Sequence, residues 1–207
     1  MNATQDMGSR FRTISSSVPV IPFDSGNVRS VELPRSFLYR NIAVRLSGSL
    51  VVTVGTTNAP LSPLPLIQKL ELVADGRKIL WTAAGIDLWE LCHIHRGKAP
   101  ELNPPALGVA TNPFSATIVI DNSAIRMQFP ADSMFDPREY EKIELRVTWG
   151  TVANVISAGT ATVSAATQID ALKRQGMVES AEARASSTRR GKAGLRCSSV
   201  SMAPPMS

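Results

Sequence analysis

Histidine is the residue type in this sequence most suited to catalysis or metal binding, and the chain contains two, His93 and His95. On a helix, residues two apart point to roughly opposite sides, so these imidazoles could not share a metal ion there. On an extended segment they could, but no Cys, Asp or Glu stands nearby at the spacing of a metal site. We therefore expect ordinary histidines.

A run of carboxylates offers a second kind of chemistry. Four acidic residues surround the stretch 134–137: Asp132, Asp136, Glu139 and Glu141. Paired carboxylates can bind calcium or transfer protons. Asp and Pro are also common turn formers, and this run separates two expected strands, which favours a turn.

Other catalytic patterns are missing from the sequence. Cys92 and Cys197 fit neither a disulfide framework nor a zinc pattern, so we expect two unpaired thiols. There is no G-x-S-x-G, no phosphate-binding glycine loop and no H-E-x-x-H. We predict that the protein is not an enzyme and has no cofactor and no small-molecule substrate.

The charge is concentrated at one end of the chain. The 22 basic and 17 acidic residues give a net charge of +5. Residues 1–170 are neutral overall, and the excess lies in 171–207, where two acidic residues (Glu179 and Glu182) face seven basic ones: Lys173, Arg174, Arg184, Arg189, Arg190, Lys192 and Arg196. Such a segment could bind nucleic acid or an anionic membrane surface without sequence specificity.

Composition also predicts the domain organisation. The segment 171–207 is of low complexity, rich in Ser, Ala, Arg and Pro, and cannot bury enough apolar surface to fold. We expect a disordered tail there, a flexible arm over 1–16, and one domain over 17–170.

Period-2 alternation predicts strands in that domain. The plainest run is 142–149, where alternate residues are apolar. Another run, 39–54, contains Gly48 and is either two strands or one bent strand. A third, 114–120, is expected to turn at Asp121-Asn122 and return through 125–129. A weaker strand is expected over 160–169.

A hairpin and a helix complete the expected elements. Asp75-Gly76 should form the tight turn between strands 66–73 and 77–81, and replacing both residues by alanine should destabilise the fold. A helix is expected from about Gly85, with Asp87 in its first turn, to His95. The predicted core consists of apolar residues in register: Ile42, Val44, Leu46, Leu70, Leu72, Trp81, Trp89, Ile118, Ile120, Ile143, Leu145, Val147 and Trp149.

Many short strands, one short helix and Pro-rich loops predict an all-β antiparallel sandwich. The segments 33–42, 67–81, 82–89 and 140–150 resemble, in this order, the N-terminal jelly-roll domain of major coat proteins of tailless icosahedral phages with an internal membrane, the corticovirus type. In that family a short strand after a glycine-containing turn is followed by a G-x-D-L helix start, here Gly85-Ile86-Asp87-Leu88. The resemblance covers about 17–170.

The resemblance implies a viral capsid protein, made in the host cytoplasm, that assembles in the virion with copies of itself and other capsid proteins. It also implies possible contact of the basic tail with the internal membrane or the genome. Such coat proteins usually carry two jelly rolls and form trimers. This chain has room for one, so it is either a single-jelly-roll relative or the first half of a double one.

Two other functions fit a jelly roll. A carbohydrate-binding module usually exposes Trp or Tyr, whereas Trp81 and Trp149 here fall in core register and Trp89 on the expected inner helix face. A cupin-type enzyme needs several histidines and a carboxylate on adjacent strands. Both are less consistent with the sequence than the coat protein.

Overall fold

A computed structural model describes residues 12–36, 38–106, 108–121 and 134–177. Residues Thr13–Met177 form one compact unit, to which the description below applies. Its elements are β1 (Arg12–Ser17), β2 (Ile21–Pro22), β3 (Val28–Glu32), β4 (Leu38–Asn58), η1 (Leu64–Leu66), β5 (Ile67–Ala74), β6 (Lys78–Ala83), α1 (Gly85–Arg96), β7 (Leu102–Asn103), β8 (Thr111–Asp121), η3 (Pro137–Glu139), β9 (Ile143–Trp149), η4 (Val152–Asn154), β10 (Ile156–Val163) and β11 (Gln168–Met177).

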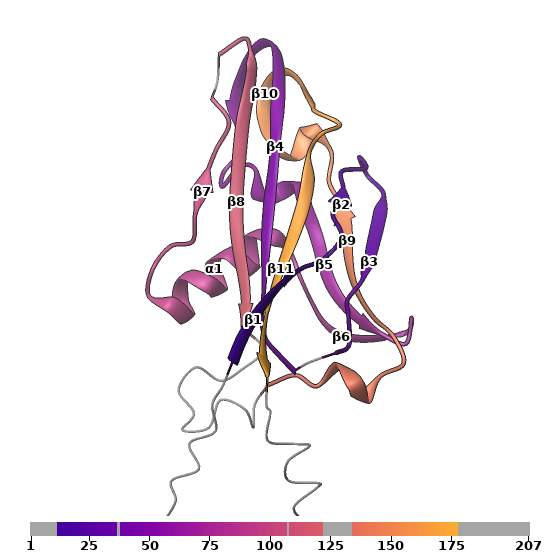
Figure 1. Ribbon diagram of the computed structural model, residues 1–207. Helices are drawn as coiled ribbons and strands as arrows, with labels where there is room; N and C mark the ends of the chain where they lie inside the picture. The colour runs from indigo at the N-terminus through magenta and orange to yellow at the C-terminus, as the bar shows by residue number, and fades with distance from the viewer. Residues whose placement is uncertain (1–11, 37, 107, 122–133, 178–207) are drawn as a thin grey trace, which may run out of the picture. The chain divides into compact units, whose positions relative to one another are not determined.

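The strands form two sheets (Figure 1). The larger sheet has the order β1-β11-β4-β8-β7, with β10 also paired to β4 and β2 to β11; the smaller sheet has the order β3-β9-β5-β6. The chain passes repeatedly between them, so that late strands pair with early ones: β11 with β4, and β9 with β3 and β5. This interleaving of antiparallel strands is a jelly roll, which confirms the predicted fold class.

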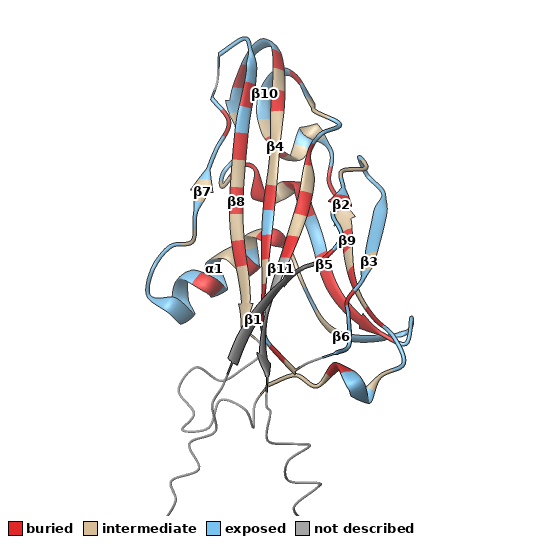
Figure 2. Cartoon of the chain, in the orientation of Figure 1, coloured by how far each residue is buried: buried red, intermediate tan, exposed pale blue. Residues whose placement is uncertain are grey.

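The core lies between the inward faces of the two sheets (Figure 2). Ten of the thirteen predicted core residues are at most 1% exposed: Ile42, Val44, Leu46, Leu70, Leu72, Ile118, Ile143, Leu145, Val147 and Trp149. The other three, Trp81, Trp89 and Ile120, are half-buried and pack against the core from its rim. They lie on the end strand β6, on α1 and near the end of β8.

The sequence left open whether 39–54 forms one strand or two, and the structure has the single long strand β4. Two strands border it end to end, since β11 pairs with its first half as far as Ser47 and β10 with its second half from Leu50. The segment that connects β10 to β11 contacts β4 at Gly48, where a Cβ would lie 2.3 Å from Oγ1 of Thr167. Glycine is therefore required here for the close approach of this segment, not for a bend in β4.

Both ends of the domain extend beyond the sequence-based boundaries. β1 lies mostly within the expected arm, and β11 runs to Met177 instead of ending at 170. The expected strand over 160–169 is divided between β10 and the start of β11. Lys173 and Arg174 pair in register with β4, so the ladder, rather than an apolar pattern, makes this segment a strand. The expected return strand 125–129 lies outside the described residues.

The hairpin between β5 and β6 has the expected turn residues. Asp75 and Gly76 have φ of 51° and 70°, and N–H of Arg77 donates to the carbonyl of Ala74 at 3.1 Å. Two consecutive positive φ angles are typical of the type I′ turn, which matches the twist of a hairpin. The Asp75 carboxylate also accepts hydrogen bonds from the backbone N–H of Glu141 at 2.8 Å and Lys142 at 3.1 Å. Asp75 thus joins the turn to the segment before β9.

We expect Asp75→Ala to lower the free energy of unfolding by about 1–3 kcal/mol, because two backbone donors lose a charged acceptor and alanine disfavours positive φ. Asp75→Asn should cost less, since an amide oxygen can replace one acceptor and asparagine tolerates this backbone. Urea unfolding followed by circular dichroism measures both. Equal losses for the two variants would contradict the role of the carboxylate.

Helix α1 begins at the predicted residue and ends one residue later than expected, at Arg96, with Gly97 as its left-handed cap at φ 64°. A Cβ on Gly85 would lie 2.8 Å from the carbonyl oxygen of Leu64, so the helix starts in close contact with η1. Its buried residues are Gly85, Leu88 and Cys92, and Trp89, which was expected on the inner face, is half-buried and packs against the core. The helix packs against β8, η1 and β5. These contacts determine which of its residues are buried.

Candidate assembly surfaces

The side chains with catalytic potential are not brought together. His93 and His95 are both exposed on α1, and the ring of His93 lies edge-on to Trp89 at 6.0 Å between centroids. Within the described residues, no group of three His, Cys, Asp or Glu is placed to hold a metal ion. Asp132 and Cys197 lie outside those residues.

The acidic run around residue 136 is a turn, as its composition favoured. Asp136 caps η3 by accepting from the backbone N–H of Arg138 at 2.9 Å, and it pairs with the Arg138 guanidinium at 2.7 Å. Hydrogen bonds from the Arg138 side chain hold the pKa of the Asp136 carboxyl below its usual value. Such hydrogen bonds stabilise the charged carboxylate, which can then hold the turn in place.

The thiol of Cys92 closes part of a sheet edge. Its Sγ accepts from the N–H of Val119 at 3.2 Å and donates to the same residue's carbonyl at 2.7 Å. Burial raises the pKa of this thiol, which makes it a poor nucleophile. The residue therefore acts in the structure of the β8 edge rather than in catalysis.

Other neighbouring groups contact the β8 edge between Ser115 and Asp121. The carbonyl of Glu101 accepts from the N–H of Thr117 at 2.9 Å, β7 pairs with Ser115, and Arg96 forms an ion pair with Asp121 at 2.8 Å. An open strand edge can pair with another chain. With these groups in place, β8 offers no continuous edge for a second copy to extend the larger sheet.

The outer face of the smaller sheet carries charges that compensate one another. Lys69 pairs with Glu71 at 3.1 Å, and Glu144 pairs with Lys142 at 2.7 Å and with Arg146 at 3.6 Å. Glu71 alternates with the inward-facing Leu70 and Leu72 along β5, yet this residue is only 4% exposed. A face whose carboxylates already have cations nearby does not require charges from a partner.

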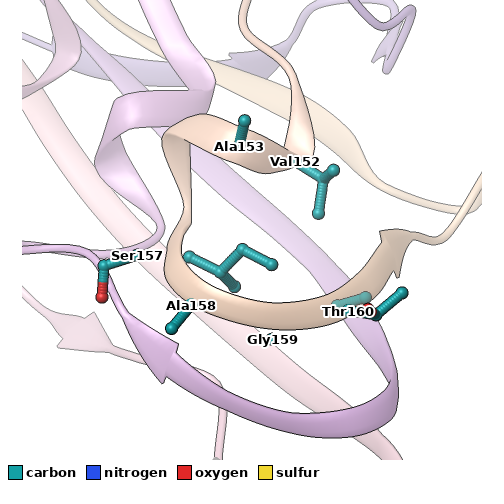
Figure 3. Close-up of a pocket in the computed structure, with 8 residues that line it drawn as sticks. Val152, Ala153, Ser157, Ala158, Gly159 and Thr160 are labelled. Carbon is teal, nitrogen blue, oxygen red and sulfur yellow. The ribbon is translucent and has the colours of Figure 1, made fainter.

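A shallow hollow of about 320 Å³ lies beside β10 (Figure 3). It is lined by η4 and β10 residues with mostly small, uncharged side chains: Val152, Ala153, Ile156, Ser157, Ala158, Gly159, Thr160 and Ala161. No general acid, base or metal ligand lines it, so it offers no chemistry for a reaction.

The described tryptophans do not form a sugar-stacking platform. Trp149 is fully buried, and Trp81 and Trp89 are half-buried against the core. Stacking on a sugar ring requires an exposed aromatic face. The alternative function as a carbohydrate-binding module therefore gains no support from these side chains.

An aromatic row closes the end of the sandwich at which β4 begins. Tyr39, at 0% exposed, contacts Phe135 at 5.9 Å between ring centroids; Phe135 stacks on Tyr140, and the Lys78 ammonium lies 5.0 Å from the Tyr140 ring. The Tyr39 hydroxyl donates to the carbonyl of Pro34. Burial raises the pKa of Tyr39 well above the ordinary value of a tyrosine phenol.

This pKa shift predicts alkaline destabilisation. The neutral phenol is favoured in the folded protein, so its contribution is complete below pH 10 and is lost as the pH rises above the unfolded-state pKa. We expect the free energy of unfolding to fall above pH 10 by up to about 1.4 kcal/mol per pH unit more than in Tyr39→Phe. Denaturant titrations of both proteins from pH 8 to 11 measure this difference, and parallel curves would contradict it.

The outward face of α1 was not singled out from the sequence, although its spacing is visible there. Leu91 is 46% and Ile94 77% exposed, the latter being the most exposed of the large apolar residues described. No helix among the described residues is long and apolar enough to span a membrane. The apolar pair is thus a feature of the exposed surface of a short helix.

Comparisons with known proteins place this fold among viral coat proteins. No protein-family model and no curated protein sequence matches the chain. The structure resembles that of the major capsid protein of the Sulfolobus turreted icosahedral virus, STIV, with a TM-score of 0.64 and 18% identity over 84% of this chain and 51% of that chain. It also resembles VP54 of PBCV-1, fitted into a reconstruction of the virophage Sputnik, with a TM-score of 0.57 and 14% identity over 89% of this chain and 46% of that chain.

The chain spans about half the length of these solved chains. At such low identity the likeness is one of fold, and the phage family suggested by the sequence is not among these neighbours. The described residues have the jelly-roll fold found in viral major capsid proteins.

Proposed function

We propose that this protein is a coat subunit of an icosahedral viral capsid, whose activity is assembly with copies of itself and other capsid proteins in the virion. The observation that supports this most strongly is the jelly-roll topology, which is similar to that of two viral capsid proteins over 84% and 89% of the chain. In addition, residues 1–170 carry no net charge that would oppose close packing of copies.

The described residues form one jelly roll. A subunit built on this single jelly roll would need six copies to make a pseudo-hexagonal capsomer, where a double-jelly-roll subunit of the kind the sequence resemblance implies takes three. The phage group with an internal membrane remains our proposal for the virus type, on the sequence resemblance alone.

Size-exclusion chromatography with light scattering, followed by negative-stain microscopy, tests the proposal on the full chain. We expect hexamers or larger shells. A variant ending at Met177 should still assemble if the jelly roll makes the contacts. A monomer at every concentration would contradict the proposed self-assembly by this chain alone and favour the first half of a double-jelly-roll subunit or a ligand-binding domain.

We further propose that the basic tail contacts an anionic layer inside the virion. Because Lys173 and Arg174 belong to β11, the charge of 178–207 consists of five basic and two acidic residues, a net +3. The internal membrane is the partner that the family resemblance implies, and the genome is the alternative. Flotation with anionic and neutral vesicles, compared with nucleic-acid binding at the same salt, distinguishes them; binding that survives truncation at Met177 would contradict a role of the tail.

A further inference from the structure

The outward face of α1 has an order of residues that is complementary to itself. Asp87, Leu91 and Ile94 follow one another at helical spacings of four and three residues, and Lys98 lies two residues beyond the end of the helix, after the Gly97 cap. With 3.6 residues per turn, the first three positions lie on one face of the helix. All four are exposed, and Leu88 and Cys92 on the opposite side are buried against the sandwich.

Charge is separated along this face. Asp87 lies in the first turn and Glu90 follows it, while His95 and Lys98 lie at the other end, Lys98 just after the Gly97 cap. Within the described part of the chain, none of these four side chains forms a hydrogen bond or an ion pair. The face therefore has an acidic end, an apolar centre and a basic end, and the rest of its own subunit does not compensate it.

We propose that α1 pairs antiparallel with α1 of a second copy about a twofold axis. With the axis at the peptide bond between Cys92 and His93, Asp87 faces Lys98 of the second copy, and Leu91 faces Ile94. Each contact occurs twice because the interface is isologous. A parallel arrangement would instead place like charges together and align the two helix dipoles unfavourably.

The position of α1 allows this approach. The helix lies at the side of the sandwich next to β8, and its last turns are largely exposed (Figures 1 and 2). The β8 edge beside it is closed by the groups described above, so that a partner at this side meets the helix rather than an open strand. Ile94, at 77% exposed, would be the centre of the buried area.

The inference rests on the proposed function and specifies one of its contacts. Two facing helices bury less than the roughly 1,200–2,000 Å² of a stable standard-size complex. We therefore expect a weak contact that becomes effective when it is repeated through a shell. An icosahedral shell contains twofold axes, at which such an isologous contact is allowed by symmetry.

A charge exchange on the full chain tests the pairing. Asp87→Lys places two lysines opposite each other, and Lys98→Asp places two aspartates, so each should weaken self-association about 10-fold, as expected when two exposed ion pairs become repulsive. The combined variant restores the opposite charges and should recover the wild-type association. Glu141→Lys, exposed on the segment before β9, is the matched control and should have no effect. Sedimentation velocity over a concentration series gives the association constants.

A second pair of variants tests the apolar centre. Ile94→Asp should abolish the contact, whereas Val109→Asp, which changes another exposed apolar residue on a loop (67% exposed), should not. Thermal melts establish that the variants fold. Failure of the double exchange to rescue association, or equal effects of the two aspartate variants, would overturn the pairing.

The outcome separates the two proposals. If the full chain assembles and is indifferent to every α1 variant, the coat function stands and the α1 contact is wrong. If the wild-type chain remains monomeric at all concentrations, both the α1 contact and self-assembly by this chain alone are overturned.

Discussion

Replacing Trp149 by alanine is expected to lower the free energy of unfolding by about 3–5 kcal/mol, the range for removing a large buried aromatic residue. Trp149 is 0% exposed at the end of β9 and lies edge-to-face with Phe23 at 5.2 Å between ring centroids. It thus joins the β9 end of the smaller sheet to the segment that connects β2 to β3. Alanine would leave a cavity in contact with both.

Trp149→Phe provides the comparison. Within the described residues, Nε1 of Trp149 is buried without a hydrogen-bond partner, and an unsatisfied buried donor costs about 1–3 kcal/mol. Phenylalanine loses packing area but also removes this donor, so its cost should be much smaller than that of alanine. Guanidinium unfolding followed by circular dichroism measures both; a phenylalanine variant as unstable as the alanine one would show that Nε1 has a partner.

Gly48→Ala is expected to cost about 1–3 kcal/mol, as for overpacking of a well-ordered interior. The added Cβ would lie 2.3 Å from Oγ1 and 2.7 Å from both Cβ and Cγ2 of Thr167. Rotation about χ1 of Thr167 cannot relieve a clash that includes its own Cβ. Thr167 is 0% exposed, so the residue has little space to move away.

The double variant Gly48→Ala with Thr167→Gly tests this explanation. Removing the Thr167 side chain should make Gly48→Ala nearly neutral, although Thr167→Gly alone is destabilising through chain entropy. A double-mutant cycle measures the coupling. Additive effects would mean that Gly48 is required for a reason other than this contact. Gly55→Ala, with no atom within 4 Å of the added Cβ, is the control on the same strand.

Local patterns in the sequence predicted the elements whose conformation depends on near neighbours. The alternation over 142–149 gave β9, because a two-residue period places one set of side chains in the core. Asp75-Gly76 indicated the hairpin turn, since few residues tolerate positive φ. The start of α1 at Gly85 was also predicted, and its end at Arg96 lies one residue beyond the expected His95.

Contacts between distant segments were beyond those patterns. β11 extends to Met177 although it contains Lys173 and Arg174, because this stretch pairs in register with β4. Glu71 has the alternation of an outward residue but is only 4% exposed. The alternation of apolar residues predicts which side of a strand faces the core, but it does not predict how far side chains on the other side are buried.

Some properties of the candidate surfaces could likewise be predicted from the sequence, and others could not. The sequence alone determined that the chain is an antiparallel β sandwich without recognisable catalytic motifs, and that its excess charge lies at one end, because composition and short-range periodicity carry that information. Only the tertiary structure decided that the β8 edge is closed by Cys92 and its neighbours and that α1 turns Leu91 and Ile94 outward. The physical reason is that exposure depends on which distant strands cover a residue, and the interleaved pairing of a jelly roll brings together segments far apart in the chain.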